Sequence, residues 1–181
     1  MKKKIAILGS TGSIGKIYHE WRDNFDEWDI YRNFREQRDY QSKKTLRMIE
    51  KRKERNPNNP NNFIGPAWEY ADVEDDAYTD GKLTDFAIKT LGDFKDSKKP
   101  FFLAVGYSKP HLPFVAPKSY WDLYDRENIE IHPEQGRHSS IPNIAYHNNH
   151  ELVNNYSDIP FNSNLSSAKQ KELIHGYKAC V

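Results

Sequence analysis

The chain has 181 residues, which is long enough for one domain with its own core. Only 36% of the residues are hydrophobic and 29% are charged, so we expect a thin core and a large share of surface and loop. The net charge of +1 excludes a global field toward nucleic acid or an anionic membrane, and no stretch approaches the ~20 apolar residues of a membrane span.

The N-terminal elements are predicted to be short. Residues 4–8 predict a buried strand, residues 9–15 a Gly/Ser-rich turn, and residues 17–40 an irregular segment, because their aromatic and charged residues follow no period. The basic start is followed by an apolar run shorter than the ~7–15 residues of a signal peptide, so we expect no export signal in the chain as written. The single cysteine, Cys180, excludes an internal disulfide.

A solvated helix is predicted over residues 41–55, with a narrow apolar stripe at Leu46 and Ile49. Its many basic residues fit a solvated face better than a nucleic-acid surface. The Asn- and Pro-rich residues 56–62 then predict a loop.

A stronger amphipathic helix is predicted to follow that loop. Thr79 or Asp80 could cap its start, because short polar side chains accept hydrogen bonds from the first helical amides. Its predicted apolar face consists of Leu83, Phe86, Ala87, Leu91 and Phe94.

The continuous apolar run at residues 100–107 predicts a buried central strand of a parallel sheet. A helix followed by such a strand indicates an α/β fold. Lys109 and His111 come directly after the run, and open α/β sheets bind ligands at the carboxyl ends of their strands. These two residues are therefore candidate site residues.

The C-terminal third is predicted to be mostly loop. A short helix is expected at residues 118–124, loop-like structure at 125–165, and a last helix at 166–179 with Leu173, Ile174 and Tyr177 as its apolar positions. The four histidines within residues 125–165, which are His132, His138, His147 and His150, do not follow a zinc-ligand spacing and no cysteine accompanies them, so we expect no metal site there.

The segment KPFFLAVGYSKPHLPF at residues 99–114 resembles the sulfatase family, in particular its iduronate-2-sulfatase branch. The neighbouring segments agree with this resemblance in the same order along the chain. They are GKIYH at residues 15–19, DGK at 80–82, PKSYWDLY at 117–124 and HGYKACV at 175–181.

The resemblance implies a partial alkaline-phosphatase-like α/β fold with an incomplete sheet, flanking helices and long loops. Sulfatases cleave sulfate esters with a formylglycine nucleophile and a calcium ion, so the implied substrate is a sulfated sugar or a glycosaminoglycan-like chain. Carried over by motif, Lys16 and His111 contact the sulfate, His19 hydrogen-bonds the nucleophile, and Lys109 is a further substrate-binding candidate. Cationic and hydrogen-bond-donating groups are what an anionic sulfuryl transition state requires.

The sequence also departs from the family. It contains no Cys-x-Pro-x-Arg segment from which formylglycine is made, and Cys180 is followed only by Val181. The acidic cluster that starts at Asp72 belongs to no sulfatase metal motif and does not have EF-hand spacing. We therefore predict a sulfatase-like fragment over residues 15–181 that retains recognition residues but is inactive alone, without the calcium ligands or the formylglycine.

The first sixteen residues resemble a different family, the NADPH-dependent 1-deoxy-D-xylulose-5-phosphate reductoisomerases. There a strand leads into a Gly-rich turn that binds the NADPH phosphates. The match ends at Lys16, so residues 1–14 are interpreted as a strand and turn of separate origin. Two alternatives to a sulfatase fragment stay open: a non-catalytic module that binds sulfated glycans, and a reductoisomerase remnant that binds NADPH.

Overall fold

The protein is described by a computed structural model that separates into two compact units. Unit 1 consists of residues 1–41 and 72–111, and unit 2 of residues 42–71 and 112–181. The residues that the structure describes are 3–7 (backbone only), 28–34, 39–58, 64–95, 99–146, 151–153, 155–160 and 164–181.

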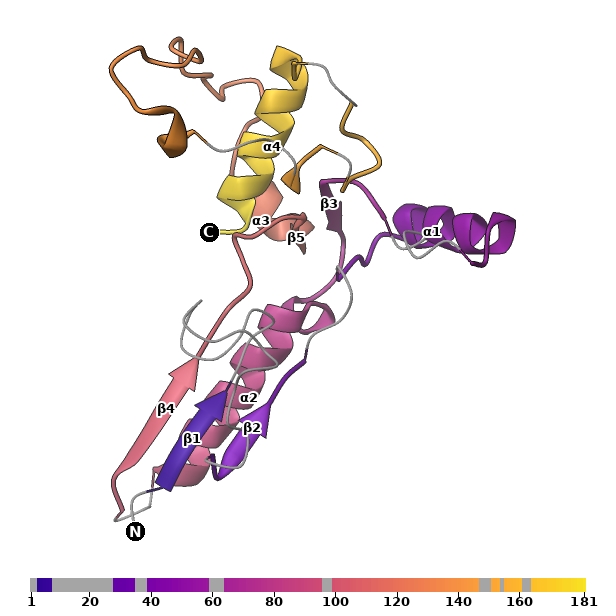
Figure 1. Ribbon diagram of the computed structural model, residues 1–181. Helices are drawn as coiled ribbons and strands as arrows, with labels where there is room; N and C mark the ends of the chain where they lie inside the picture. Colours follow the sequence, from indigo (N-terminus) through magenta and orange to yellow (C-terminus); the bar gives the residue numbers. More distant parts are fainter. Residues whose placement is uncertain are drawn as a thin grey trace. The chain divides into compact units, whose positions relative to one another are not determined.

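Helices and strands are interspersed along the chain (Figure 1). In order they are β1 (Lys3–Ile7), β2 (Ile30–Arg32), α1 (Lys43–Arg55), β3 (Trp68–Ala71), the 3-10 helix η4 (Asp75–Ala77), α2 (Thr79–Phe94), β4 (Phe101–Val105), β5 (Phe114–Pro117), α3 (Lys118–Trp121), the 3-10 helix η5 (Asn143–Ala145) and α4 (Ser167–Ala179). Among the described residues, no helix is both long and apolar enough to cross a bilayer.

Unit 1 contains a three-stranded parallel sheet with the strand order β2-β1-β4, and α2 packs beside it (Figure 1). Ile5 is the register partner of both Ile30 and Leu103, and Ile7 is the partner of Val105. The α/β class and the strand predicted at residues 4–8 are confirmed. The prediction of irregular structure throughout residues 17–40 was wrong at β2, whose three residues are too few to show a period.

The buried face of α2 differs in part from the predicted one. Leu83 is fully buried and packs with Ala87 and Phe94, as expected. Leu91, however, is exposed, and Thr90 is buried in its place. The Thr90 hydroxyl donates a hydrogen bond of 2.7 Å to the Phe86 carbonyl, and this bond satisfies the buried polar group.

The strand β4 is parallel, as predicted, but it is not a buried central strand. It lies at the end of the described strand order, with β1 as its partner. Phe101 and Phe102 are 43% and 52% exposed. Phe102 stacks on Trp28 at a ring distance of 6.3 Å, so this outer face is covered only in part.

Unit 2 is built around two short parallel strands, β3 and β5, against which α3 and α4 pack. These strands were not predicted from the sequence, because four residues carry too little pattern to identify a strand. The predicted short helix and last helix are confirmed as α3 and α4. Ser166 caps α4 by accepting a hydrogen bond from the Lys169 amide at 3.2 Å.

The face of α4 that unit 2 buries differs in part from the predicted one, although Leu173 packs against a buried cluster as expected. His175, Gly176 and Ala179 are the buried residues, whereas Tyr177 is 49% exposed. The His175 ring accepts a hydrogen bond from Arg126 Nε through Nδ1 at 3.1 Å, and its Nε2 lies 2.9 Å from the Trp121 carbonyl oxygen. An arginine can only donate, so Nδ1 is the acceptor and Nε2 carries the hydrogen.

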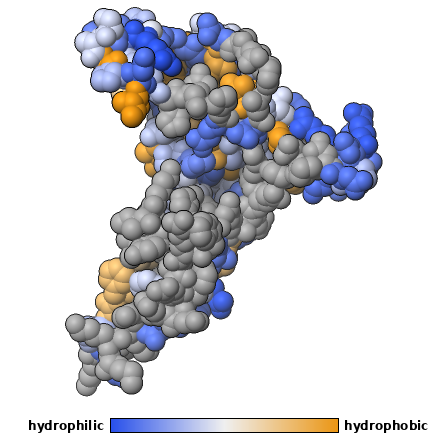
Figure 2. Space-filling view, in the orientation of Figure 1, coloured by the Kyte–Doolittle hydropathy of each residue, from blue (hydrophilic) through white to orange (hydrophobic). Residues whose placement is uncertain are grey.

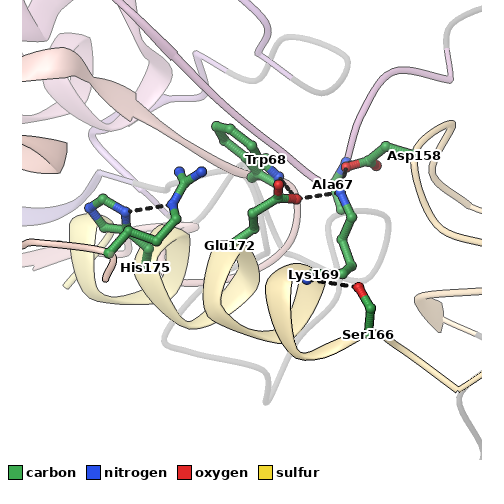
Figure 3. Close-up of polar contacts among 8 residues, drawn as sticks. Ala67, Trp68, Asp158, Ser166, Lys169, Glu172 and His175 are labelled. Atoms are coloured by element: carbon green, nitrogen blue, oxygen red, sulfur yellow. Dashed lines mark hydrogen bonds and ion pairs between the residues drawn. The ribbon is translucent and has the colours of Figure 1, made fainter. Parts of the chain in front are cut away.

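A polar network joins β3 to α4 (Figure 3). The Lys169 ammonium contacts the Glu172 carboxylate and lies 3.1 Å from Asp158 Oδ2. Glu172 also accepts a hydrogen bond of 3.0 Å from the Trp68 indole, and Asp158 accepts one of 2.7 Å from the Ala67 amide. Each carboxylate therefore connects the helical lysine to the start of β3.

The network shifts two pKa values in opposite directions. Burial alone would raise the pKa of Glu172, but hydrogen bonds from Lys169 and Trp68 outweigh it and lower the pKa below the ordinary 4.5. Burial alone would lower the pKa of Lys169, but hydrogen bonds to Glu172 and Asp158 raise the pKa above the ordinary 10.5.

We expect this network to stabilise unit 2 between about pH 4.5 and pH 10.5, and to lose its stabilising effect at lower and higher pH. As pH falls below 4.5, Glu172 takes up a proton first in the unfolded chain, so stability declines. As pH rises past 10.5, Lys169 loses its proton first in the unfolded chain, with the same result. Urea unfolding as a function of pH measures this. Glu172→Gln should lower the free energy of unfolding by about 1 kcal/mol at neutral pH. It should also reduce the loss of stability on acidification, and an unchanged loss would contradict the role given to Glu172.

Candidate functional site

The candidate site lies where the chain leaves β4. This strand ends at Val105, and the predicted site residues Lys109 and His111 follow within the next six positions. Because β1 runs parallel to β4 with Ile7 opposite Val105, the chain also leaves β1 at this edge of the sheet. Ligand chemistry in open α/β sheets gathers at such an edge.

The loop after β4 is anchored by one carboxylate, that of Asp80 in the first turn of α2. The Ser108 amide donates hydrogen bonds to Asp80 Oδ1 and Oδ2 at 3.0 and 3.1 Å, and the Lys109 amide donates one to Oδ2 at 2.9 Å. The Ser108 hydroxyl lies 3.2 Å from Oδ1 as well. Hydrogen bonds to a charged acceptor are about twice as strong as neutral ones, so Asp80 holds two successive residues of the loop firmly.

Two further contacts define the conformation of the loop. The Tyr107 hydroxyl lies 3.0 Å from Thr84 Oγ1, which itself donates a hydrogen bond of 2.8 Å to the Asp80 carbonyl. The His111 amide donates a hydrogen bond of 2.9 Å to the Ser108 carbonyl, which closes a tight turn. The peptide bond between Lys109 and the following proline is cis.

The start of α2 is also capped from a distant part of the chain. Neither of the predicted caps acts on the helix: Tyr78 is the N-cap residue, and it makes no side-chain cap hydrogen bond. Instead, Asp39 Oδ2 accepts a hydrogen bond of 2.6 Å from the Thr79 amide. The prediction of a local cap was wrong because Asp80 is engaged by the β4 loop and the capping carboxylate lies 40 residues upstream. Both carboxylates lie at the positive end of the α2 dipole, where negative charge is favourable.

The structure brings two of the predicted site residues together. The Lys109 ammonium lies 3.3 Å from the His111 carbonyl oxygen, and the His111 side chain is exposed. Lys16 and His19 lie outside the described residues, as does the Gly-rich turn proposed to bind NADPH. Asp80 was missed as a loop anchor, because nothing in the sequence shows that its side chain faces a strand end 28 residues downstream.

An exposed imidazole and a lysine ammonium on one short loop can bind an anion and donate hydrogen bonds to it. The described residues contain no group of three or more His, Cys, Asp and Glu side chains placed to hold a metal ion.

No family model matches the chain. It is 45% identical over 78 residues to mouse iduronate 2-sulfatase, a match that covers 43% of this chain and 14% of the relative. The human iduronate 2-sulfatase is 44% identical over 75 residues, covering 41% of this chain and 14% of the relative. A protein named sulfatase from Formosa agariphila is 34% identical over 89 residues, covering 48% of this chain and 17% of the relative.

The chain thus spans about one seventh of the length of the first two curated relatives. All the relatives given above carry sulfatase names, and the resemblance of residues 1–16 to a reductoisomerase has no support among them.

Proposed function

Because part of this chain is a sulfatase-family sequence, we propose that it supplies a sulfate-binding loop of a sulfuric ester hydrolase that acts on sulfated sugars. His111 and Lys109 are the described residues that contact the sulfate in this proposal. Lys16 and His19 are proposed to complete the binding site from the segment that follows β1. The parallel sheet of unit 1 is proposed to be part of an alkaline-phosphatase-like fold.

The observation that carries the proposal is the anchored loop between β4 and His111. A loop that binds an anion tightly must be rigid before binding, because ordering it on binding reduces the affinity. Asp80 provides this order by accepting hydrogen bonds from the amides of Ser108 and Lys109. The imidazole of His111 and the ammonium of Lys109 are the groups of this ordered loop that we propose to meet the ligand.

The roles proposed for the two side chains follow from their chemistry. A lysine is a compact point charge and suits one sulfate oxygen. A histidine can donate a hydrogen bond to the sulfate and also pass a proton to the leaving oxygen of the ester. The sequence contains no Cys-x-Pro-x-Arg segment, so no step through a formylglycine is derived for these residues.

The matched relatives suggest the first substrate to try. Two of them are named iduronate 2-sulfatase, so the proposed ligand class is a sugar with a 2-sulfated iduronate. For the 181-residue polypeptide by itself, we propose binding of this ligand without turnover.

The test is calorimetric titration of the chain with a disaccharide that contains 2-sulfated iduronate and with the same disaccharide without sulfate. We expect saturable binding of the sulfated form only. His111→Ala and Lys109→Ala should each weaken it about tenfold, which is the usual loss for one hydrogen bond to a charged group.

The matched controls are exposed residues of the same types, His132→Ala and Lys89→Ala, which should leave the affinity unchanged. Equal binding of the two disaccharides, or equal loss in the control variants, would refute the proposal.

An aryl sulfate assay decides between the two candidate functions. Hydrolysis that depends on His111 would favour an enzyme, whereas binding without hydrolysis would favour a non-catalytic glycan-binding module.

A further inference from the structure

The helix α1 carries a row of basic side chains that the loop after β4 does not account for. Lys44, Arg47, Lys51 and Arg55 are spaced three or four residues apart, so they lie on one side of the helix. At about 1.5 Å per residue, this row extends for roughly 16 Å along the axis. We refer to these four residues as the basic row.

The basic row is exposed and is not neutralised locally. Thr45 is the buried residue of α1, and hydrophilic side chains cover the helix (Figure 2). Within the described residues, no carboxylate forms an ion pair with any of the four cations. Glu50 and Glu54 lie three residues after Arg47 and Lys51 respectively, and among the described residues neither forms an ion pair with a member of the row.

The row also borders a pocket. A cavity of about 600 Å³ is lined by the four cations together with Met48 and Arg52. Arg52 has a structural role, because its guanidinium donates a hydrogen bond to the Ile64 carbonyl. All six lining residues come from α1, so this is an open, mainly cationic hollow on the surface of the helix, to which Met48 adds an apolar side chain.

We propose that the basic row binds an extended sulfated polysaccharide, in addition to the single sulfate ester at the β4 loop. This inference rests on the proposed function, since it names the polymer on which that function acts. Successive cations lie about one helical turn apart, so a chain with repeated sulfates can contact several of them at once. Arginine and lysine bind anionic oxygens of this kind through charge-assisted hydrogen bonds.

A sulfated glycan fits this surface better than a nucleic acid. The whole chain has a net charge of only +1, and the basic row extends for only roughly 16 Å, which is short for the footprint of a duplex. The matched relatives are sulfatases, which provides a reason for a sulfated chain to be present. Duplex DNA therefore serves as a competitor in the test.

The test compares two double variants of the same helix. Lys44→Gln with Lys51→Gln removes two cations from the basic row, and Lys43→Gln with Lys53→Gln removes two exposed cations that do not line the pocket. The two variants have the same composition and net charge, so nonspecific attraction is equal in both. Their helix content, measured by circular dichroism, should match the parent chain.

The readout is the fluorescence anisotropy of a labelled, size-defined heparin oligosaccharide, of its desulfated form and of a DNA duplex. We expect the parent chain to bind the sulfated oligosaccharide, and to bind it more weakly as salt is raised. The Lys44 and Lys51 variant should lose about tenfold in affinity, and the Lys43 and Lys53 variant less than about twofold.

Equal losses in the two variants, no binding of the oligosaccharide, or tighter binding of the duplex would each overturn the inference. Failure of the proposed function is recognised separately with the sulfated disaccharide. If His111→Ala abolishes disaccharide binding while the basic row has no effect on the oligosaccharide, the inference fails and the proposed function stands. If the basic row alone matters, the inference stands and the role of His111 is wrong.

Discussion

Gly81→Ala is expected to destabilise unit 1 by about 3 kcal/mol or more. A methyl group at this position would lie 1.9 Å from the carbonyl oxygen of Asp75 and 2.9 Å from the amide nitrogen of Asp76. Both are backbone atoms, so no rotation of a side chain can relieve the overlap. The first turn of α2 or the preceding η4 must move, and overpacking of this kind commonly costs 1–3 kcal/mol, or more where the backbone is rigid.

The same helix offers a matched control for this prediction. Gly92 has no atom within 4 Å of the position of an added methyl group. Gly92→Ala should therefore stabilise the chain by about 0.5–1 kcal/mol, because alanine loses less backbone entropy in a helix. Urea unfolding of the two variants measures the contrast. Gly81→Ala as stable as Gly92→Ala would mean that the close approach of η4 to α2 does not exist in solution.

Asp80→Ala is expected to release the loop that carries His111 and to cost about 2–3 kcal/mol of stability. It removes the acceptor of the Ser108 and Lys109 amides, and hydrogen bonds to a charged acceptor contribute about 1.5–3 kcal/mol. Hydrogen exchange should show faster exchange at these two amides first. Binding of the sulfated disaccharide should weaken as well, because Asp80 acts as a positioning residue for the loop.

Asp85→Ala is the matched control for that variant. Asp85 is exposed on the same helix, and its removal changes the net charge equally. This control should leave the exchange of the Ser108 amide unchanged. Asp80→Asn should give an intermediate result, because an amide oxygen can still accept a hydrogen bond but carries no charge. Equal exchange rates in the Asp80→Ala and Asp85→Ala variants would show that Asp80 does not hold the loop.

The helices were predictable because helix formation depends on residues that are close in sequence. The apolar spacing of α2 and the basic composition of α1 are local patterns, and both helices lie where these patterns placed them. The parallel strand β4 was found from its apolar run. The strands β2, β3 and β5 have only three or four residues each, and it is pairing with distant strands that makes them strands.

The residues of the candidate site also fall into two groups, those that a local sequence pattern suggests and those whose role depends on tertiary contacts. His111 and Lys109 could be identified because they follow a recognisable strand within a motif that resembles a family. Asp80 could not, because its role depends on the β4 loop packing against the start of α2. The local cap expected at Thr79 was replaced by the carboxylate of Asp39, which is distant in sequence.

The amino-acid sequence by itself therefore determined the α/β class, the main helices and the sulfatase resemblance, and it led to the proposal of two site residues after β4. Only the tertiary structure decided that β4 has an exposed face, that Thr90 and not Leu91 is buried, and that Asp80 anchors the loop. The physical reason is that periodicity records which side of an element is apolar. Contacts between residues far apart in the chain decide which group each polar side chain meets. They also decide whether a second layer covers the face of a strand.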